Sequence, residues 1–281
     1  MMKSDMIVKK LEKKAKEVRQ LMVQTLLATQ SGHPGGSFSC VDIMTALYFK
    51  VMDIDPAQPK WPDRDRFVLS KGHAALGFYS VLALRGYFDK ELMKQFRQNG
   101  SILSGHPDME KIPGVDMSTG SLGQGLSVGV GMALAAKYDR KKYRTFVLIG
   151  DGESQEGQIW EAALASAQFK LDNLVAIVDR NFMQLDGYTE QIMKLEPLSK
   201  KWEAFGWKVK EIDGHNMIQI INVLQNTPVE KEKPTMIIAK TIKGKGLRLM
   251  ENKYEWHGMK HPIKDEDAKS ILEDVGLQYD S

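Results

Sequence analysis

The second half of the chain alternates short apolar runs with amphipathic segments, and this pattern constrains the fold more than any other feature. The apolar runs predict strands at 145–149, 174–178, 208–212 and 235–239. The segments between them predict helices at 159–169, 199–205 and 217–224. Strands that alternate with helices form parallel sheets, because each connection must return over one face of the sheet. The sequence therefore predicts an α/β fold, a doubly wound parallel sheet with helices on both faces.

The first half of the chain predicts mainly helices. Apolar residues recur at three- and four-residue steps over 5–29, and a second helical stretch follows at 40–52. A short strand is expected at 66–69, followed by a helix at 73–84. The glycine-rich segment 122–136 would be a helix of low intrinsic propensity. Such a helix has to be compensated by very close packing or by a ligand beside it.

The chain contains no internal repeat, low-complexity segment or recognisable linker. Residues 1–281 are therefore expected to form a single domain with a helical N-terminal extension. A tail helix is predicted at 265–275, where Gly276 provides a typical C-terminal stop.

Composition excludes several classes of protein. The net charge of +3 comes from scattered lysines, and clusters such as 240–245 are interpreted as solvated faces, because nucleic-acid binders concentrate basic residues in a stripe. Cys40 is the only cysteine, so no internal disulfide is possible. No apolar run is long enough to span a bilayer, and no secretory signal is recognisable. We expect a cytoplasmic enzyme without nucleic-acid or membrane partners.

Two polar side chains follow two of the predicted strands closely. Asp151 lies in the run Gly150-Asp151-Gly152 after the strand at 145–149, and Asn181 follows the strand at 174–178. Ligands of parallel sheets bind at the carboxyl ends of the strands. A carboxylate and an amide oxygen suit Mg²⁺, and glycines allow main chain to approach a diphosphate. The pair therefore predicts a site for a metal ion and a diphosphate.

The same segment resembles the thiamine diphosphate motif of the transketolase family. The motif is carried by GDGESQEG at 150–157 and DRN at 179–181. Six further blocks match in the order of the family: SGHPG at 31–35, LSKGHA at 69–74, GHP at 105–107, TGSLGQG at 119–125, DGHN at 213–216 and WHG at 256–258. Together they cover the chain from about Leu11 to about Pro262.

This resemblance implies a cofactor site for thiamine diphosphate and Mg²⁺, for which Ca²⁺ or Mn²⁺ can substitute. The metal ligands would be Asp151, Asn181 and the main-chain carbonyl of Met183. The cofactor would lie beside Gly152, and beside Gly120, Ser121 and Leu122 of the glycine-rich loop. Two departures are visible, since Phe182 stands where many thiamine diphosphate enzymes have a second asparagine, and Ser121 stands where proline is common.

Four histidines coincide with active-site positions of the family. By the resemblance, His73 and His257 lie near the diphosphate and the reacting carbon, and His33, His106 and His257 lie near the hydroxyls and carbonyl of the donor sugar. Imidazole can donate, accept and change charge near neutral pH. Which histidine transfers which proton stays open. His215 belongs to a matched loop and is assigned no role, and His261 is interpreted as an ordinary surface residue.

Glu156 and Glu161 lie at the start of the helix that follows the GDG turn. Carboxylates are favoured there by the helix dipole, which is one explanation for them. The resemblance implies another, in which both face an interface between two copies of the chain and Glu156 also lies beside the cofactor.

The resemblance also implies a partner. The family needs a second domain that carries a glutamate and an aromatic pocket for the pyrimidine ring, and the matched region contains neither. We expect the N-terminal subunit of a split transketolase, paired with a C-terminal subunit in a heterotetramer of two plus two. The enzyme would transfer a two-carbon ketol group from a ketose phosphate to an aldose phosphate.

Several alternatives stay open from the sequence. A split transketolase could act on a sulfonated or branched sugar. The chain could also belong to a 2-oxo acid dehydrogenase or a deoxyxylulose phosphate synthase, although the histidine blocks favour transketolase. A non-catalytic relative is disfavoured, because Asp151, Asn181 and His73 are all present.

Overall fold

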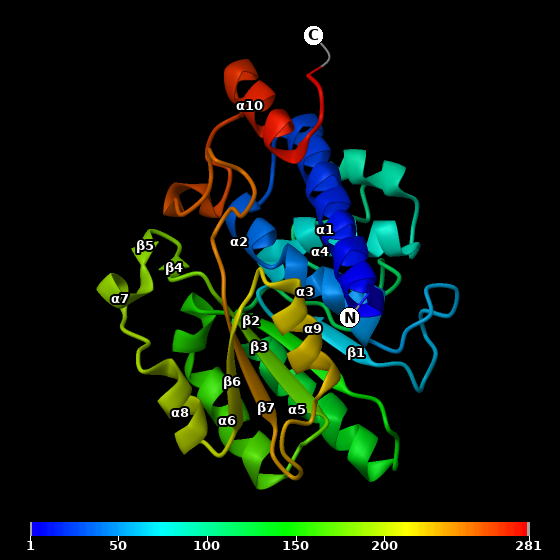
Figure 1. Cartoon of the computed structure of the whole chain (residues 1–281), viewed down its shortest axis with the longest axis vertical. Coiled ribbons are helices and arrows are strands. Elements are labelled where there is room, and N and C mark those ends of the chain that lie inside the picture. Colours follow the sequence, from blue (N-terminus) through cyan, green and yellow to red (C-terminus); the bar gives the residue numbers. More distant parts are fainter. Residues whose placement is uncertain (1, 280–281) are drawn as a thin grey trace.

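The computed structural model describes residues 2–279 and has a parallel sheet between two layers of helices (Figure 1). The strands are β1 (Arg66–Leu69), β2 (Thr145–Gly150), β3 (Leu174–Arg180), β4 (Met183–Gln184), β5 (Gly187–Tyr188), β6 (Lys208–Asp213) and β7 (Thr235–Lys240). The α-helices are α1 (Met2–Thr29), α2 (Pro34–Ser39), α3 (Val41–Ala46), α4 (Ala75–Arg85), α5 (Gln124–Tyr138), α6 (Gly157–Gln168), α7 (Thr189–Ile192), α8 (Leu198–Ala204), α9 (Met217–Gln225) and α10 (Asp265–Val275). Short 3₁₀- or π-helical segments are η1 (Leu47–Val51), η2 (Gly72–Ala74), η3 (Lys90–Gln95), η4 (Gly152–Gln155) and η5 (Tyr254–His257). Over residues 2–279, no helix has both the length and the apolar character needed to cross a bilayer.

The main sheet has the order β1–β2–β3–β7–β6, and all five strands are parallel. The predicted α/β fold with helices on both faces is therefore confirmed. Because the strands run the same way, their carboxyl ends meet at one edge, where sheets of this kind bind ligands. β4 and β5 form a separate antiparallel hairpin, which projects at the left of Figure 1 together with α7.

Successive residues of each strand enter two separate apolar cores. Phe146 and Leu148 of β2 pack in the core with α1, α3, α4, α9 and α10. Val147 and Ile149 pack in the opposite core with α5, α6 and α8. Side chains of a strand alternate between the two faces, so a strand covered on both faces must be apolar throughout. This burial explains the unbroken apolar runs in the sequence.

Helix α5 packs closely on the sheet through its glycines. A Cβ atom added at Gly125 would collide with the side chain of Ser70, and one at Gly129 would collide with that of Val147. Gly131 faces open space instead. The close packing expected for this glycine-rich helix is confirmed, and it offsets the low helix propensity.

Four strands extend further at their C-terminal ends than the sequence predicted. β2, β3, β6 and β7 continue one or two residues past the last apolar residue, ending at Gly150, Arg180, Asp213 and Lys240. Strand pairing uses main-chain groups, so a polar side chain does not end it. The continuation brings the polar residues of the next section to the edge of the sheet.

Candidate functional site

A cavity of about 270 Å³ lies at the carboxyl edge of the sheet. Its lining comes from segments that are far apart in the chain: Gly36, Lys71, His73, Leu122, Gly150, Asp151, Gly152, Glu153, Gln155, Glu156, Asn181, Met183, Gln184, Leu185, Lys243 and His257. The three residues predicted to bind the metal all belong to this lining. Most of the predicted cofactor contacts belong to it as well, with Gly120 and Ser121 as exceptions.

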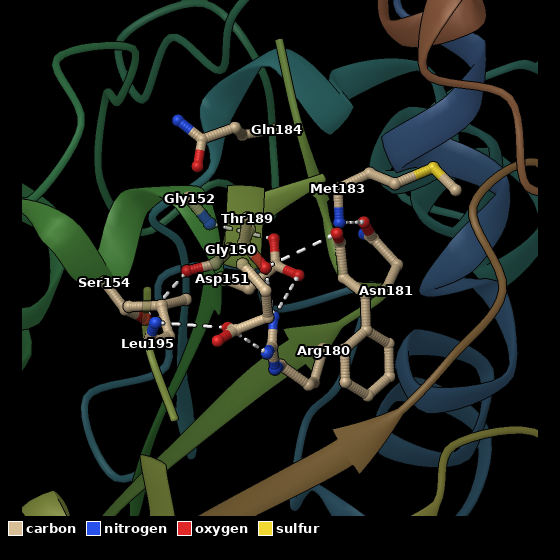
Figure 2. A network of polar contacts seen from close by, with 12 residues as sticks. Gly150, Asp151, Gly152, Ser154, Arg180, Asn181, Met183, Gln184, Thr189 and Leu195 are labelled. Atoms are coloured by element: carbon tan, nitrogen blue, oxygen red, sulfur yellow. Dashed lines mark hydrogen bonds and ion pairs between the residues drawn. The ribbon is translucent and has the colours of Figure 1, made fainter. Parts of the chain in front are cut away.

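Asp151 is buried at the end of β2 with both carboxylate oxygens engaged. Its Oδ1 accepts a hydrogen bond from the N–H of Gly152 at 2.8 Å, and its Oδ2 accepts one from Nη1 of Arg180 at 3.2 Å (Figure 2). Burial, and then repulsion from the carboxylate of Asp179, raises the pKa of Asp151 to about 6. A cation bound at this carboxylate would favour its ionised form and oppose that shift.

Asn181 follows β3 and presents an amide oxygen close to Met183. Its Oδ1 accepts a hydrogen bond from the main-chain N–H of Met183 at 3.2 Å. Among residues 2–279, no group of three or more His, Cys, Asp or Glu side chains is arranged to hold a metal ion. A cation in this cavity would therefore bind an amide oxygen and a main-chain carbonyl besides Asp151. Such hard oxygen ligands, completed by phosphate and water, fit Mg²⁺.

A buried ion pair joins Lys71 of the cavity lining to Asp179, which is not part of the lining. Ser39 and Thr241 donate their hydroxyl groups to the same carboxylate, and Lys71 Nζ also donates to the carbonyl of Gly36 at 2.8 Å. Burial alone would lower the pKa of Lys71 and raise that of Asp179, but their mutual attraction outweighs burial and shifts both pKa values the other way. Asp179 is thus committed to Lys71 and is not a candidate metal ligand.

Lys243 is a site residue that the sequence did not predict. The interpretation of 240–245 as a solvated face is wrong at this position, because Lys243 is 2% exposed and lines the cavity. Its Nζ lies 3.2 Å from Nδ1 of His257. Burial, and then repulsion from Lys71, lowers the pKa of Lys243 to about 8. A buried ammonium group on a cavity wall suits the negative charge of a diphosphate.

Four of the predicted histidines form one cluster. The ring centres of His73 and His257 are 4.9 Å apart, and His33 lies 5.6 Å from His73, 5.8 Å from His257 and 6.4 Å from His106. The structure brings these four together from separate loops. The Nδ1 atom of His33 is buried and has no hydrogen-bond partner among the described residues. Most buried polar atoms in proteins have a partner, so this nitrogen is available to a ligand or a water molecule.

The cluster is held in its neutral form by its surroundings. Burial, and then the charge of Arg97, lowers the pKa of His33 to about 4. Burial, and then Lys243, lowers the pKa of His257 to about 3. The pKa values of His73 and His106 are also lowered, chiefly by burial. Each neutral ring offers one N–H donor and one acceptor, which suits contacts to hydroxyl groups and carbonyl oxygens.

The other two histidines lie elsewhere. His215 Nδ1 is 2.8 Å from a carboxylate oxygen of Asp42, and its Nε2 accepts the main-chain N–H of Ile242 at 2.9 Å. It does not line the cavity. His261 is exposed, which agrees with the surface role predicted for it.

Glu153 connects three segments of the site, a role that the sequence did not predict either. Its carboxylate accepts hydrogen bonds from Ser70 and from the main-chain N–H groups of Gly123 and Gly150, the last two at 2.9 Å. Gly123 directly precedes α5 and Gly150 ends β2. One buried carboxylate therefore fixes the glycine-rich loop relative to the strand that carries Asp151.

The glycine-rich loop contributes less to the cavity than predicted. Only Leu122 of its three predicted contacts lines the cavity. Gly120 has φ +150°, and a Cβ atom there would lie 3.2 Å from the ring of His106. Gly120 therefore lets the loop pack against that histidine.

The two glutamates of the predicted interface are both exposed. Glu156 lines the cavity and precedes α6, whereas Glu161 lies on α6 outside the cavity. Leu134 of α5 and Leu164 of α6 are exposed apolar side chains on these two packed helices. This surface is open to a second polypeptide.

The chain matches a known family over nearly its whole length. The family described as "Transketolase, thiamine diphosphate binding domain" matches residues 11–281. A 6-deoxy-6-sulfo-D-fructose transketolase subunit from Clostridium sp. is 48% identical over 250 residues, covering 89% of this chain and 91% of that protein. An apulose-4-phosphate transketolase subunit from Phocaeicola vulgatus is 47% identical over 252 residues, covering 90% of this chain and 89% of that protein.

A solved structure has the same fold over nearly all of the chain. The transketolase from Leishmania mexicana superposes with a TM-score of 0.88 at 33% identity. The match covers 95% of this chain but only 41% of that one. The chain therefore spans about two-fifths of a transketolase of that length, and about nine-tenths of the two subunits above.

Proposed function

Because this chain belongs to the transketolase family, we propose that it binds thiamine diphosphate with Mg²⁺ and transfers a two-carbon ketol group from a ketose to an aldose when a second subunit is present. The observation that carries the proposal is the cavity itself. It gathers oxygen ligands for a cation, a buried lysine for a diphosphate, and two of four clustered histidines. The relatives named above are transketolase subunits, which favours ketol transfer over a 2-oxo acid dehydrogenase component.

In this proposal the cation is held by Asp151, Asn181 and the main-chain carbonyl of Met183. Lys243 and the main-chain N–H groups after Gly150 meet the diphosphate. Thiamine diphosphate, when bound, supplies the electron sink for breaking a carbon–carbon bond next to a carbonyl group. The protein has to bind it, orient it and exclude water from the reacting atoms.

The histidines orient the sugar and exchange protons with it. Their lowered pKa values keep all four rings neutral near pH 7. His33 and His106 are not part of the cavity lining, so we assign them to the hydroxyl groups of the donor. His73 and His257 line the cavity and lie nearer to the cofactor. A neutral imidazole can accept a proton from one sugar hydroxyl while it donates to another oxygen.

The partner is proposed to be a C-terminal subunit that carries the pyrimidine domain. Support comes from the two relatives, whose names describe subunits and whose lengths this chain nearly covers. Self-association through Glu156 and Glu161 would give a heterotetramer of two plus two, with residues 1–281 as the diphosphate-binding domain. A cytoplasmic location stays a prediction from the sequence.

The donor sugar is proposed to be a ketose with an anionic end group. A phosphorylated ketose is the first choice, in line with the family. A sulfonated or branched sugar is a second choice, favoured by the names of the two relatives reported above. Comparing ketol transfer from these donors by the assembled enzyme would distinguish them.

The test is reconstitution. The purified chain with Mg²⁺ and thiamine diphosphate should transfer no ketol group, and adding a pyrimidine-domain subunit encoded beside it should restore transfer. Robust activity from this chain alone would refute the two-subunit proposal. No activity with any of the three donor types in a well-folded complex would refute the reaction.

A further inference from the structure

Arg180 is a buried arginine that connects the proposed metal site to a surface segment. It is 1% exposed and directly precedes Asn181. Its Nη1 contacts Oδ2 of Asp151 at 3.2 Å and Oγ1 of Thr189 at 2.7 Å (Figure 2). Its Nη2 contacts Oε1 of Glu190 at 2.9 Å and Oε1 of Glu196 at 3.0 Å.

The segment 182–196, which we call the strap, carries three of these partners. It contains β4, β5 and α7 and leaves the body of the protein directly after Asn181. Met183 and Leu195 near the ends of the strap are buried, but Leu185 and Met193 between them are 58% and 60% exposed, so the middle of the strap buries little apolar surface. Phe182 lies under the guanidinium group of Arg180, with the carbon of that group 4.1 Å from the ring centre. Segments with few buried apolar contacts open at low cost, and polar anchors then determine where they lie.

The position of Arg180 creates an electrostatic conflict for a metal site. Its charge lies beside Asp151, the one carboxylate proposed to bind the cation, so it repels a cation there. The guanidinium group of Arg180 also forms ion pairs with Glu190 and Glu196. These two carboxylates neutralise Arg180 from the side opposite to Asp151. Without them, Arg180 would be free to pair fully with Asp151 and compete with the cation.

We propose that Arg180 is a positioning residue through which the strap carboxylates Glu190 and Glu196 set the affinity of Asp151 for its metal ion. The inference rests on the proposed function, because it takes Asp151 as a metal ligand. It adds a regulation of that site, since Arg180, which already contacts Asp151, shares its charge with the two strap carboxylates and would direct all of it at Asp151 without them. Linkage is reciprocal, so binding of the cation must stabilise the contacts of the strap with Arg180 by the same free energy.

The first experiment measures Mn²⁺ binding to the full chain with thiamine diphosphate present, by electron paramagnetic resonance of the free ion. Glu190→Gln combined with Glu196→Gln should weaken Mn²⁺ binding about fivefold, the low end of measured couplings, because both carboxylates are partly exposed. Glu203→Gln is the matched control, since Glu203 pairs with Lys200 and has no contact with Arg180. It should leave the affinity unchanged.

A double-mutant cycle tests the route through Arg180. In an Arg180→Met background, the two glutamine substitutions should no longer change the affinity for Mn²⁺, because no guanidinium group remains beside Asp151. An equal loss of Mn²⁺ affinity in the parent and in the Arg180→Met background would show that the carboxylates do not act through Arg180. That result would overturn the role proposed for Arg180. Hydrogen exchange in the parent chain gives a second readout that needs no substitution. Amides of 187–195 should exchange more slowly when Mn²⁺ is bound, and no change there would overturn the coupling.

Asp151→Asn distinguishes failure of this inference from failure of the proposed site. If Asp151→Asn binds Mn²⁺ as well as the parent chain does, the metal lies elsewhere and both proposals fall. If Asp151→Asn loses binding while the strap variant matches the parent, the metal site stands and the coupling alone is wrong.

Discussion

The Nζ atom of Lys243 lies 3.2 Å from Nδ1 of His257, and both groups line the same cavity. No carboxylate within salt-bridge distance of Lys243 is found among the described residues. Two nitrogen groups in contact in a buried place need a negative charge or a shared proton to be stable. Burial, and then Lys71, lowers the pKa of Lys243, and burial, and then Lys243, lowers the pKa of His257. A diphosphate in the cavity would supply the missing charge.

Lys243→Met should therefore weaken binding of thiamine diphosphate with Mg²⁺. A hydrogen bond to a charged group contributes roughly 1.5–3 kcal/mol, so affinity should fall about 10- to 100-fold. Calorimetric titration of the purified chain, or of the assembled enzyme, measures it. Lys240→Met is the control, because Lys240 is exposed and pairs with Glu211 on the surface. Equal affinities for Lys243→Met and the control would contradict the assignment.

His106→Ala should lower turnover with ketose donors more than it lowers cofactor affinity. His106 lies 6.4 Å from His33 and outside the lining of the cavity, so its contact is assigned to the sugar. Loss of a positioned acid–base group costs about 10²- to 10⁴-fold in rate. Steady-state kinetics of the reconstituted enzyme and a parallel titration of the cofactor separate the two effects. His261→Ala, at an exposed histidine, should have no effect on either quantity. Normal turnover of His106→Ala would remove this residue from the active site.

Glu156→Ala combined with Glu161→Ala should weaken assembly of the enzyme. Both side chains are exposed in the single chain, and α5 and α6 also carry exposed apolar residues. Two-fold contacts would bury them against a second copy. Light scattering measures the mass of the assembled enzyme, and Glu230→Ala with Glu232→Ala provides a control at a loop on the surface. A double variant with the mass and the cofactor affinity of the parent would refute the interface.

The stability of the free chain should fall as the pH drops below 6.5. His33, His73 and His257 take up protons in the unfolded chain near pH 6.5, whereas in the folded chain the pKa is about 4 for His33, about 3 for His257 and well below its usual value for His73. Between these pH values the unfolded state binds more protons than the folded state. Each histidine therefore raises the equilibrium constant of unfolding by up to about tenfold for each pH unit of decrease. Asp151 acts in the opposite direction, because its raised pKa makes the folded chain bind a proton first.

Urea unfolding at a series of pH values measures this dependence. His33→Gln removes one of the three histidines and should flatten the decline between pH 6.5 and about 4. A decline of the same slope in the parent chain and the variant would show that His33 is not buried in its neutral form.

The sheet could be predicted from the sequence because its strands are covered on both faces. Burial on both faces requires unbroken apolar runs such as 145–149, and these runs are short enough to be distinguished from helices. The hairpin of β4 and β5 could not be predicted in this way. Each of its strands has two residues, which is too short to show any periodicity.

Residues of the candidate site that lie in recognisable motifs were easier to predict than residues whose roles depend on tertiary contacts. Asp151, Asn181 and the histidines lie in short motifs, several of them at predicted strand ends. Lys243 lies in a basic run that resembles a solvated face, and only the tertiary structure brings it under His257. Glu153 is adjacent to the metal motif, but its role depends on Ser70 and Gly123, which are distant in the chain. Contacts of that kind have no local signal.

The rings of His33 and His257 lie 5.8 Å apart, although one belongs to the first segment of the chain and the other to the last. During synthesis the N-terminal histidine leaves the ribosome long before its neighbour exists. The histidine cluster therefore cannot be completed before residue 257 has been synthesised. A ligand stabilises only the states that bind it. A ligand of this cluster would therefore stabilise the completed fold and would have no effect on the early steps of folding.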